Sequence, residues 1–251
     1  MQPSASSSMS NNANMAPFMN TKALAAEDFK ITSTRLGYDS IMTRRVVLAS
    51  ASPSRKRLLE SVAIDFDVLV SGVDEEAPEI MKLPPADMVL ALAIMKAHTV
   101  KNTFDCGDNT LIIGCDSTFE FEGENLGKPG TRENAIARAH QVSGKSGLLH
   151  TGHCVIDTAQ GLEVSDISTA RVYFAKMSDQ EIENYVDSGE PINVAGGFTL
   201  DGLSAPFITK IEGDPSGIIG LSLPTLRKII LNLGLSWADI SSVSKKEQVS
   251  A

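Results

Sequence analysis

Between residues 44 and 240, short runs of apolar and β-branched residues alternate with longer amphipathic stretches. This alternation is typical of an α/β fold, which is the fold class that the sequence predicts. Strands are predicted at 45–50, 66–70, 111–115, 149–156, 162–177, near 198 and at 207–211. Helices are predicted at 53–61, 85–101, 132–143, from 179 onward and at 224–233.

The two ends of the chain differ from this central region. Residues 1–43 are mostly polar or small, and 1–21 carry neither a charge nor an apolar core of signal-peptide length, so a disordered tail is predicted. From residue 241 the chain turns polar again, which predicts a second tail over 241–251. We therefore expect one folded domain at 44–240.

Composition and charge exclude several classes of protein. The net charge is −9, and the basic residues form no extended patch, so binding to DNA or RNA as polymers is not expected. A few converging cations can still hold a small anion. The longest apolar run, 88–95, has eight residues, well short of the roughly 20 that span a bilayer. Three cysteines without a CxxC pair indicate a reducing compartment, the cytoplasm.

One strand-to-helix turn combines hydroxyl groups and cations. The segment LASASPSRKR at 48–57 places Ser50, Ser52 and Arg55 where a strand gives way to a helix. Free backbone N–H groups and the positive end of the helix dipole favour phosphate at such a turn. Alternatively, Ser52 only caps the helix and Arg55 is a solvated surface charge. The segment is not a P-loop, because the chain contains no GxxxxGK[ST] motif.

Further candidates are carboxylates and lysines. Asp116 follows the predicted strand at 111–115, a position that faces the ligand crevice in open α/β sheets. Glu75 can add a second carboxylate for a divalent cation. Lys96 and Lys128, converging with them, would suit a Mg²⁺-triphosphate. The ordinary alternatives are a turn residue for Asp116, a solvated loop for Glu75 and surface positions for the lysines.

The remaining motifs are weaker. The four histidines form no HExxH pattern, so zinc is not expected. The segment SGKS at 143–146 resembles a phosphate loop, but we favour a helix C-terminus closed by Gly144 in a left-handed conformation.

Taken together, these segments resemble the Maf family of nucleoside triphosphate pyrophosphatases, also called septum-formation inhibitor proteins, over about residues 45–234. The resemblance implies a mixed, curved sheet flanked by helices in two lobes, with the nucleotide in the cleft between them, and a homodimer. The segments that carry it include LASASP (48–53), VDE (73–75), GCDST (114–118), LGKP (126–129), YVDSGEP (185–191) and GLSLP (220–224).

The same resemblance assigns roles to matching residues. It implies that Asp116 is the catalytic carboxylate and that Glu75 and Asp116 bind Mg²⁺ or Mn²⁺. The metal would draw charge off the phosphates while Asp116 activates water, so that the α–β anhydride opens to a nucleoside monophosphate and pyrophosphate. The phosphate ligands implied are Ser50, Ser52, Arg55, Lys96 and Lys128.

Three positions depart from the subgroups of the family. Family members that resemble the dTTP/UTP enzymes carry Arg, Thr and Gln where this chain has Ser54, Ser117 and Asp201, and the 7-methyl-GTP subgroup tends to carry Trp, Gln and Glu. The preferred base is therefore open. Ser117 and Asp201 are expected to contact substrate, and a carboxylate at 201 suits guanine- or cytosine-like edges better than uracil O4.

Two functions from different classes fit the sequence. The first is a cytoplasmic, metal-dependent pyrophosphatase that removes surplus or non-standard nucleoside triphosphates. The second is a non-catalytic regulator of septum formation that senses nucleotides. Asp116 favours the enzyme, because a sensor needs no carboxylate to handle water.

Overall fold

The computed structural model describes residues 44–242, so the tail predicted at 1–43 and most of the one at 241–251 lie outside the described residues. Its centre is a seven-stranded mixed sheet of order β2-β1-β3-β5-β6-β7, with β4 paired to β3. The strands are β1 Arg45–Leu48, β2 Asp67–Val68, β3 Thr110–Phe121, β4 Glu124–Leu126, β5 Ser146–Asp157, β6 Leu162–Phe174 and β7 Ile208–Glu212. The helices are α1 Pro53–Ser61, α2 Pro85–Thr103, α3 Arg132–Val142, α4 Asp179–Asp187, α5 Pro215–Ile219 and α6 Leu223–Asn232.

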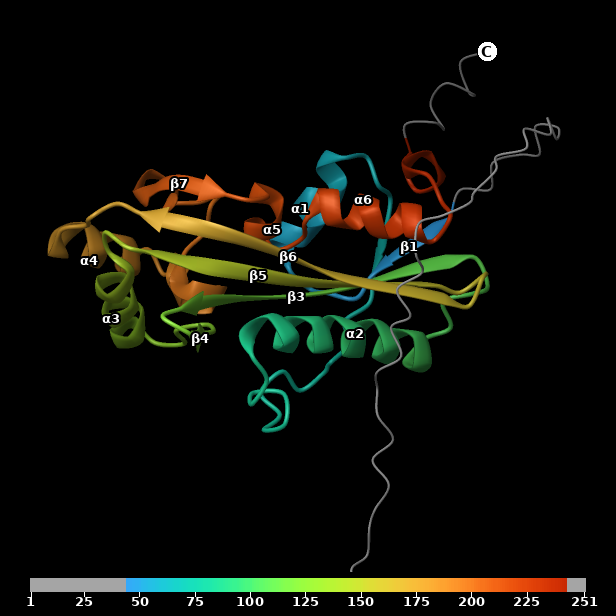
Figure 1. Cartoon of the computed structure of the whole chain (residues 1–251), viewed down its shortest axis with the longest axis horizontal. Helices are drawn as coiled ribbons and strands as arrows, with labels where there is room; N and C mark the ends of the chain where they lie inside the picture. The colour runs from blue at the N-terminus through green and yellow to red at the C-terminus, as the bar shows by residue number, and fades with distance from the viewer. Residues whose placement is uncertain (1–43, 243–251) are drawn as a thin grey trace, which may run out of the picture. The chain divides into compact units, whose positions relative to one another are not determined.

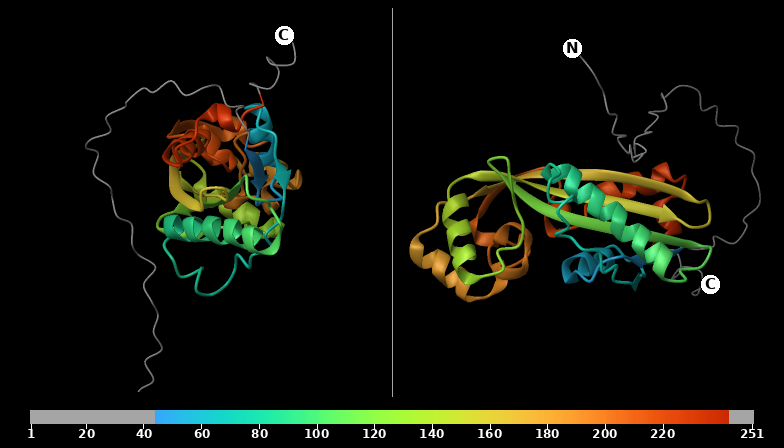
Figure 2. Two further views of the ribbon diagram at one scale, coloured as in Figure 1. Left: turned by 90° about the vertical axis from the view of Figure 1, so that its right-hand side faces the viewer. Right: turned by 90° about the horizontal axis from the view of Figure 1, so that it is seen from below.

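Helices cover both faces of the sheet. The long helix α2 lies along one face of β3 and β5, whereas α1, α5 and α6 lie on the opposite side (Figure 1). The helices α3 and α4 pack against each other at one end of the long strands (Figure 2). The strands β1, β2 and β3 run parallel and the other pairs antiparallel, which confirms the predicted α/β class with a mixed central sheet.

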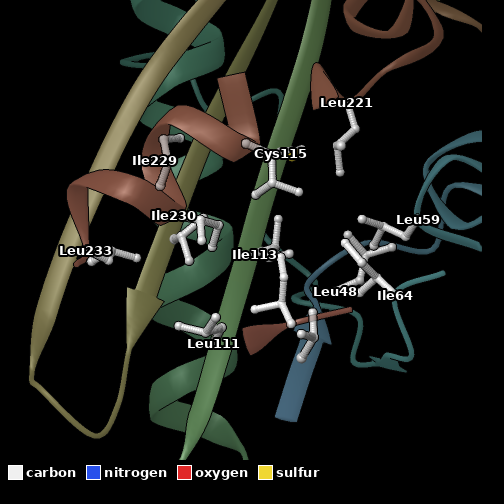
Figure 3. Packing of buried hydrophobic residues seen from close by; sticks show 14 residues of the cluster. Leu48, Leu59, Ile64, Leu111, Ile113, Cys115, Leu221, Ile229, Ile230 and Leu233 are labelled. Atoms are coloured by element: carbon white, nitrogen blue, oxygen red, sulfur yellow. The ribbon is translucent and has the colours of Figure 1, made fainter. Parts of the chain in front are cut away.

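The long strands join two hydrophobic cores. One core surrounds the first half of β3 and includes Ile113, Leu48 and Ile229 (Figure 3). The other surrounds its second half, where the Phe119 ring makes edge contacts with Phe174 and Phe198. The middle of β3 therefore lies between two packed regions, and the site described below lies there.

Two strand predictions were wrong. The strand that begins near residue 111 does not end at Asp116 but continues to Phe121, because its second half pairs with both β5 and β4. No strand forms near Phe198, which follows the short 3-10 helix Ala195–Gly197. Its apolar character reflects the aromatic core rather than a sheet. The short β4 and α5 were not predicted.

Three helices begin at a residue whose side-chain hydroxyl caps the helix. Ser52 caps α1 with Pro53 in the first turn, and Thr131 caps α3. Ser178 and Glu181 form a capping box at the start of α4. These signals are local, since a hydroxyl one residue before a helix satisfies a free N–H group wherever the helix later packs. Among residues 44–242, no helix is long and apolar enough to cross a membrane.

Glycines allow α2 to approach the sheet closely. A Cβ atom at Gly152 would lie 2.3 Å from the Val89 carbonyl oxygen. We expect Gly152→Ala to lower the free energy of unfolding by about 3 kcal/mol, because overpacking would push α2 off β5. Urea unfolding measures this effect. Gly127→Ala is the control, since nothing lies within 4 Å of its added Cβ. Equal stability of both variants would contradict the close packing.

Buried His153 predicts acid sensitivity. Its Nε2 accepts a hydrogen bond from the Ser222 N–H at 2.8 Å, and burial lowers its pKa from 6.5 to about 4. As the pH falls below 6.5, His153 therefore becomes protonated in the unfolded chain before it does so in the folded protein. The free energy of unfolding should fall by about 3 kcal/mol between pH 6.5 and pH 4. His153→Gln should lose this component in unfolding experiments across that range, whereas the half-exposed His140→Gln should keep it. Parallel pH profiles for wild type and His153→Gln would contradict the prediction.

Candidate active site

The first turn of α1 holds a buried arginine. Arg55 is 8% exposed, which excludes the alternative that it is a solvated surface charge. Its guanidinium donates to Ser50 Oγ at 3.0 Å, to Ser117 Oγ at 3.1 Å and to the Gly220 carbonyl oxygen at 2.7 Å. The parallel pairing of β1 with β3 brings Ser117 beside the turn that follows β1. Ser52 is the cap of α1 as well as part of this turn.

All the hydrogen-bond partners of the Arg55 guanidinium are neutral. Within residues 44–242, no carboxylate forms a salt bridge with it. A buried cation without a carboxylate partner keeps its charge available for an anion, and a guanidinium matches phosphate oxygens well. Ser117 is held in turn by Thr151, whose hydroxyl lies 2.9 Å away and donates to the Gly217 carbonyl oxygen.

A lysine joins two carboxylates in the middle of the sheet. Lys96 Nζ lies 2.6 Å from Asp116 Oδ1 and 2.5 Å from Glu75 Oε1. The Lys96 and Asp116 side chains are 7% and 11% exposed, and Glu75 is 42% exposed. Lys128 Nζ lies 3.6 Å from the other oxygen of Glu75. Helix α2, strand β3, the loop before α2 and the turn after β4 thus each supply one charged group.

The charges of this cluster keep Glu75 ionised. Burial alone would raise the pKa of Glu75, but the Lys96 and Lys128 ammonium groups outweigh that effect and hold it below its ordinary value. Glu75 is therefore a carboxylate at neutral pH. The cluster presents both cations and anions at neutral pH, which is the mixture that a metal-bound polyphosphate requires.

One cavity of about 770 Å³ contains every site residue that the sequence predicted. Its volume is in the range of small-ligand sites. Apolar side chains, including Phe198 and Leu200, line it beside the charged groups. The predicted residues in its wall are Ser50, Ser52, Arg55, Glu75, Lys96, Asp116, Ser117, Lys128 and Asp201, and Ser54 lies there as well.

The two carboxylates fit a metal that arrives with its substrate. Glu75 and Asp116 share Lys96 as a partner, so both face the same point. The described residues contain no group of three or more His, Cys, Asp and Glu side chains arranged for a metal. Mg²⁺ is commonly held by one or two carboxylates plus substrate phosphates and water. Two carboxylates beside the cations Arg55, Lys96 and Lys128 match that pattern.

Other sequence candidates lie outside the cavity wall. Gly144 follows α3 with a φ of 72°, as expected for a helix C-terminus, and Lys145 pairs with Glu122. His150 is buried between Glu120 and Thr169 rather than beside another histidine.

Sequence reasoning missed two contributors. Thr151 lies inside a long strand, and no role was predicted for it. Arg57 binds Asp201 Oδ2 at 3.0 Å across 144 residues of sequence, so no local signal exists for this pair.

Comparison with known proteins agrees with this geometry. Residues 45–233 match a family model described as Maf-like protein. A relative from Streptomyces coelicolor, named nucleoside triphosphate pyrophosphatase, is 50% identical over 197 residues, 78% of this chain and 94% of the relative. Relatives with the same name from Salinispora tropica and Thermosynechococcus vestitus are 46% and 45% identical, covering 76% and 78% of this chain and 84% and 97% of their own lengths.

Proposed function

The chain belongs to the Maf-like protein family and is a nucleoside triphosphate pyrophosphatase, a hydrolase; we propose that it cleaves the α–β anhydride with a divalent cation bound. The products are a nucleoside monophosphate and pyrophosphate. The observation that carries this proposal is the contact of Lys96 with both Asp116 and Glu75 in the wall of one cavity, next to the buried Arg55.

The phosphates bind to the cationic wall. Arg55, Lys96 and Lys128 line the cavity and supply three positive charges, and the backbone N–H groups at the start of α1 add to them. Glu75 and Asp116 would hold a divalent cation, which would draw further charge off the phosphate oxygens. Lys96 is bound by carboxylates in this structure, so a triphosphate would compete with them for its ammonium group.

Asp116 activates the attacking water by accepting its proton. Its Oδ1 accepts from Lys96, whereas Oδ2 has no hydrogen-bond partner within residues 44–242. That free oxygen accepts a proton from water while the water oxygen bonds to the α-phosphorus. The bond from the α-phosphorus to the bridging oxygen breaks, and pyrophosphate leaves with the electron pair. The proton held at Asp116 then passes to solvent.

The nature of the substrate, the location and the assembly also belong to this proposal. We place the enzyme in the cytoplasm, as a homodimer that acts on surplus or non-standard nucleoside triphosphates. The described cysteines are free and buried, in keeping with a reducing compartment. A part in septum formation stays a prediction.

Product analysis separates the enzyme from a nucleotide sensor. The purified protein is incubated with a panel of standard and modified nucleoside triphosphates and Mg²⁺ or Mn²⁺. The proposal predicts equal amounts of monophosphate and pyrophosphate, and no turnover after chelation of the metal. Binding without turnover on the whole panel would favour the sensor, and diphosphate plus phosphate would contradict attack at the α-phosphorus.

A further inference from the structure

Arg57 joins two residues of the cavity wall from outside it. Its Nη2 lies 3.0 Å from Ser54 Oγ and 3.0 Å from Asp201 Oδ2. Ser54 and Asp201 both line the cavity, and they come from α1 and from the segment 199–204. The Arg57 side chain itself is 59% exposed. A single guanidinium therefore links two walls of the cavity near the surface.

We propose that Arg57 is a positioning residue that sets the choice among nucleobases by holding Asp201 and Ser54 in the cavity wall. This inference rests on the proposed function. The substrate class that it favours carries an amino group on the base edge, as guanine and cytosine do, over uracil or thymine.

The segment 199–204 has its own support, independent of Arg57. Glu190 accepts hydrogen bonds from the Thr199 hydroxyl at 2.5 Å and from the Leu203 N–H at 3.0 Å. The Ser204 hydroxyl accepts from the Thr199 N–H and donates to the Thr199 carbonyl oxygen. These bonds fix the backbone on both sides of Asp201. Loss of Arg57 should therefore redirect the Asp201 carboxylate without unfolding the segment.

The charge distribution assigns Asp201 to the base end. A carboxylate repels phosphate oxygens, and the phosphate-binding cations Arg55 and Lys96 make no salt bridge with Asp201. Apolar groups such as Phe198 and Leu200 line the same cavity and suit the flat face of a base. The nucleoside therefore lies toward Asp201, and the phosphates toward the cations.

The pairing of Asp201 explains the preferred base edge. Arg57 occupies Oδ2, and Oδ1 has no hydrogen-bond partner within residues 44–242. A free carboxylate oxygen accepts from an amino group. In uracil and thymine the N3–H lies between two carbonyl oxygens, which a carboxylate repels. The Arg57 contact fixes which oxygen faces the cavity, and thereby which edge fits.

Exposed ion pairs add little to stability, so Arg57 can be replaced without loss of the fold. The test compares Arg57→Gln with Asp201→Asn and with a matched control, Arg132→Gln. Arg132 forms an exposed ion pair with Asp187 and does not line the cavity. For each protein, kcat and KM are measured with GTP, CTP, UTP and dTTP.

We expect the wild type to prefer GTP or CTP, and Arg57→Gln to lose about tenfold of that preference through KM, the size of one lost hydrogen bond. Its kcat on the best substrate should stay within about twofold, because the residues around Asp116 are untouched. Asp201→Asn should lose at least as much preference, Arg57→Lys should recover part of it, and Arg132→Gln should match the wild type.

Three results would overturn the inference: a wild type without base preference, an Arg57→Gln variant with unchanged ratios, or a loss confined to kcat. Should the wild type hydrolyse neither these four nor any other triphosphate of the panel described above, the proposed function fails separately. Because no KM can then be measured, the same variants are compared by their affinities for GMP, CMP and UMP, measured by calorimetry. An unchanged ratio of affinities in Arg57→Gln would overturn the role of Arg57 there as well.

Discussion

Asp116→Asn is expected to lower kcat by at least about 100-fold, the scale of lost general-base assistance. The amide keeps the size of the side chain and an acceptor for Lys96, but it loses the negative charge and the basicity of the free oxygen. Asp187→Asn, at an exposed residue outside the cavity wall, should retain wild-type turnover. The comparison requires only that both variants fold, which thermal unfolding shows.

Binding by the Asp116→Asn variant then distinguishes two roles. If Asp116 chiefly activates water, the variant should still bind a Mg²⁺-triphosphate, and more tightly, because a carboxylate near the phosphates is gone. If Asp116 chiefly anchors the metal, the affinity for Mg²⁺ should fall with activity, and excess Mn²⁺ should restore part of it. Wild-type turnover by the variant would remove Asp116 from the mechanism.

Lys96→Met is expected to impair both catalysis and folding. Loss of its charge at the phosphates should lower kcat by at least about 100-fold. The substitution also leaves the buried Asp116 without its cation, and a broken buried pair costs about 3 kcal/mol. Lys101→Met, at an exposed lysine near the end of the same helix, should change neither property.

A double variant tests the cause of this instability. Lys96→Met combined with Asp116→Asn removes both charges, so it should recover most of the stability that Lys96→Met alone loses, but none of the activity. Chemical unfolding of the single and double variants measures the coupling. Additive losses would mean that Lys96 stabilises the fold through packing of its chain rather than through Asp116.

Features that depend on neighbouring residues could be predicted from the sequence, whereas contacts between distant residues could not. Ser52 could be recognised as a cap from the sequence because a cap depends on its own helix only. Asp116 was selected as a candidate because it follows an apolar run, although it lies within β3 rather than at the end of a strand. The partner of Asp201 was not found, because the contact with Arg57 depends on how α1 and the segment 199–204 pack.

Neighbouring strands supply the rest of the site. Ser117 and Thr151 are partners because β3 and β5 pair in one register, which the alternation of residues does not specify by itself. The burial of Arg55 likewise follows from contacts with residue 220, far along the chain. The sequence was therefore sufficient to predict which residues line the cavity. It was not sufficient to predict their hydrogen-bond partners, because these depend on how distant segments pack.

The position of water attack tests the central claim most directly. The enzyme is allowed to hydrolyse its best nucleoside triphosphate in water enriched in oxygen-18, and the label is located by mass spectrometry of both products. Attack at the α-phosphorus, with Asp116 accepting the proton, predicts label in the nucleoside monophosphate and none in pyrophosphate. Label in pyrophosphate would contradict this account of the site.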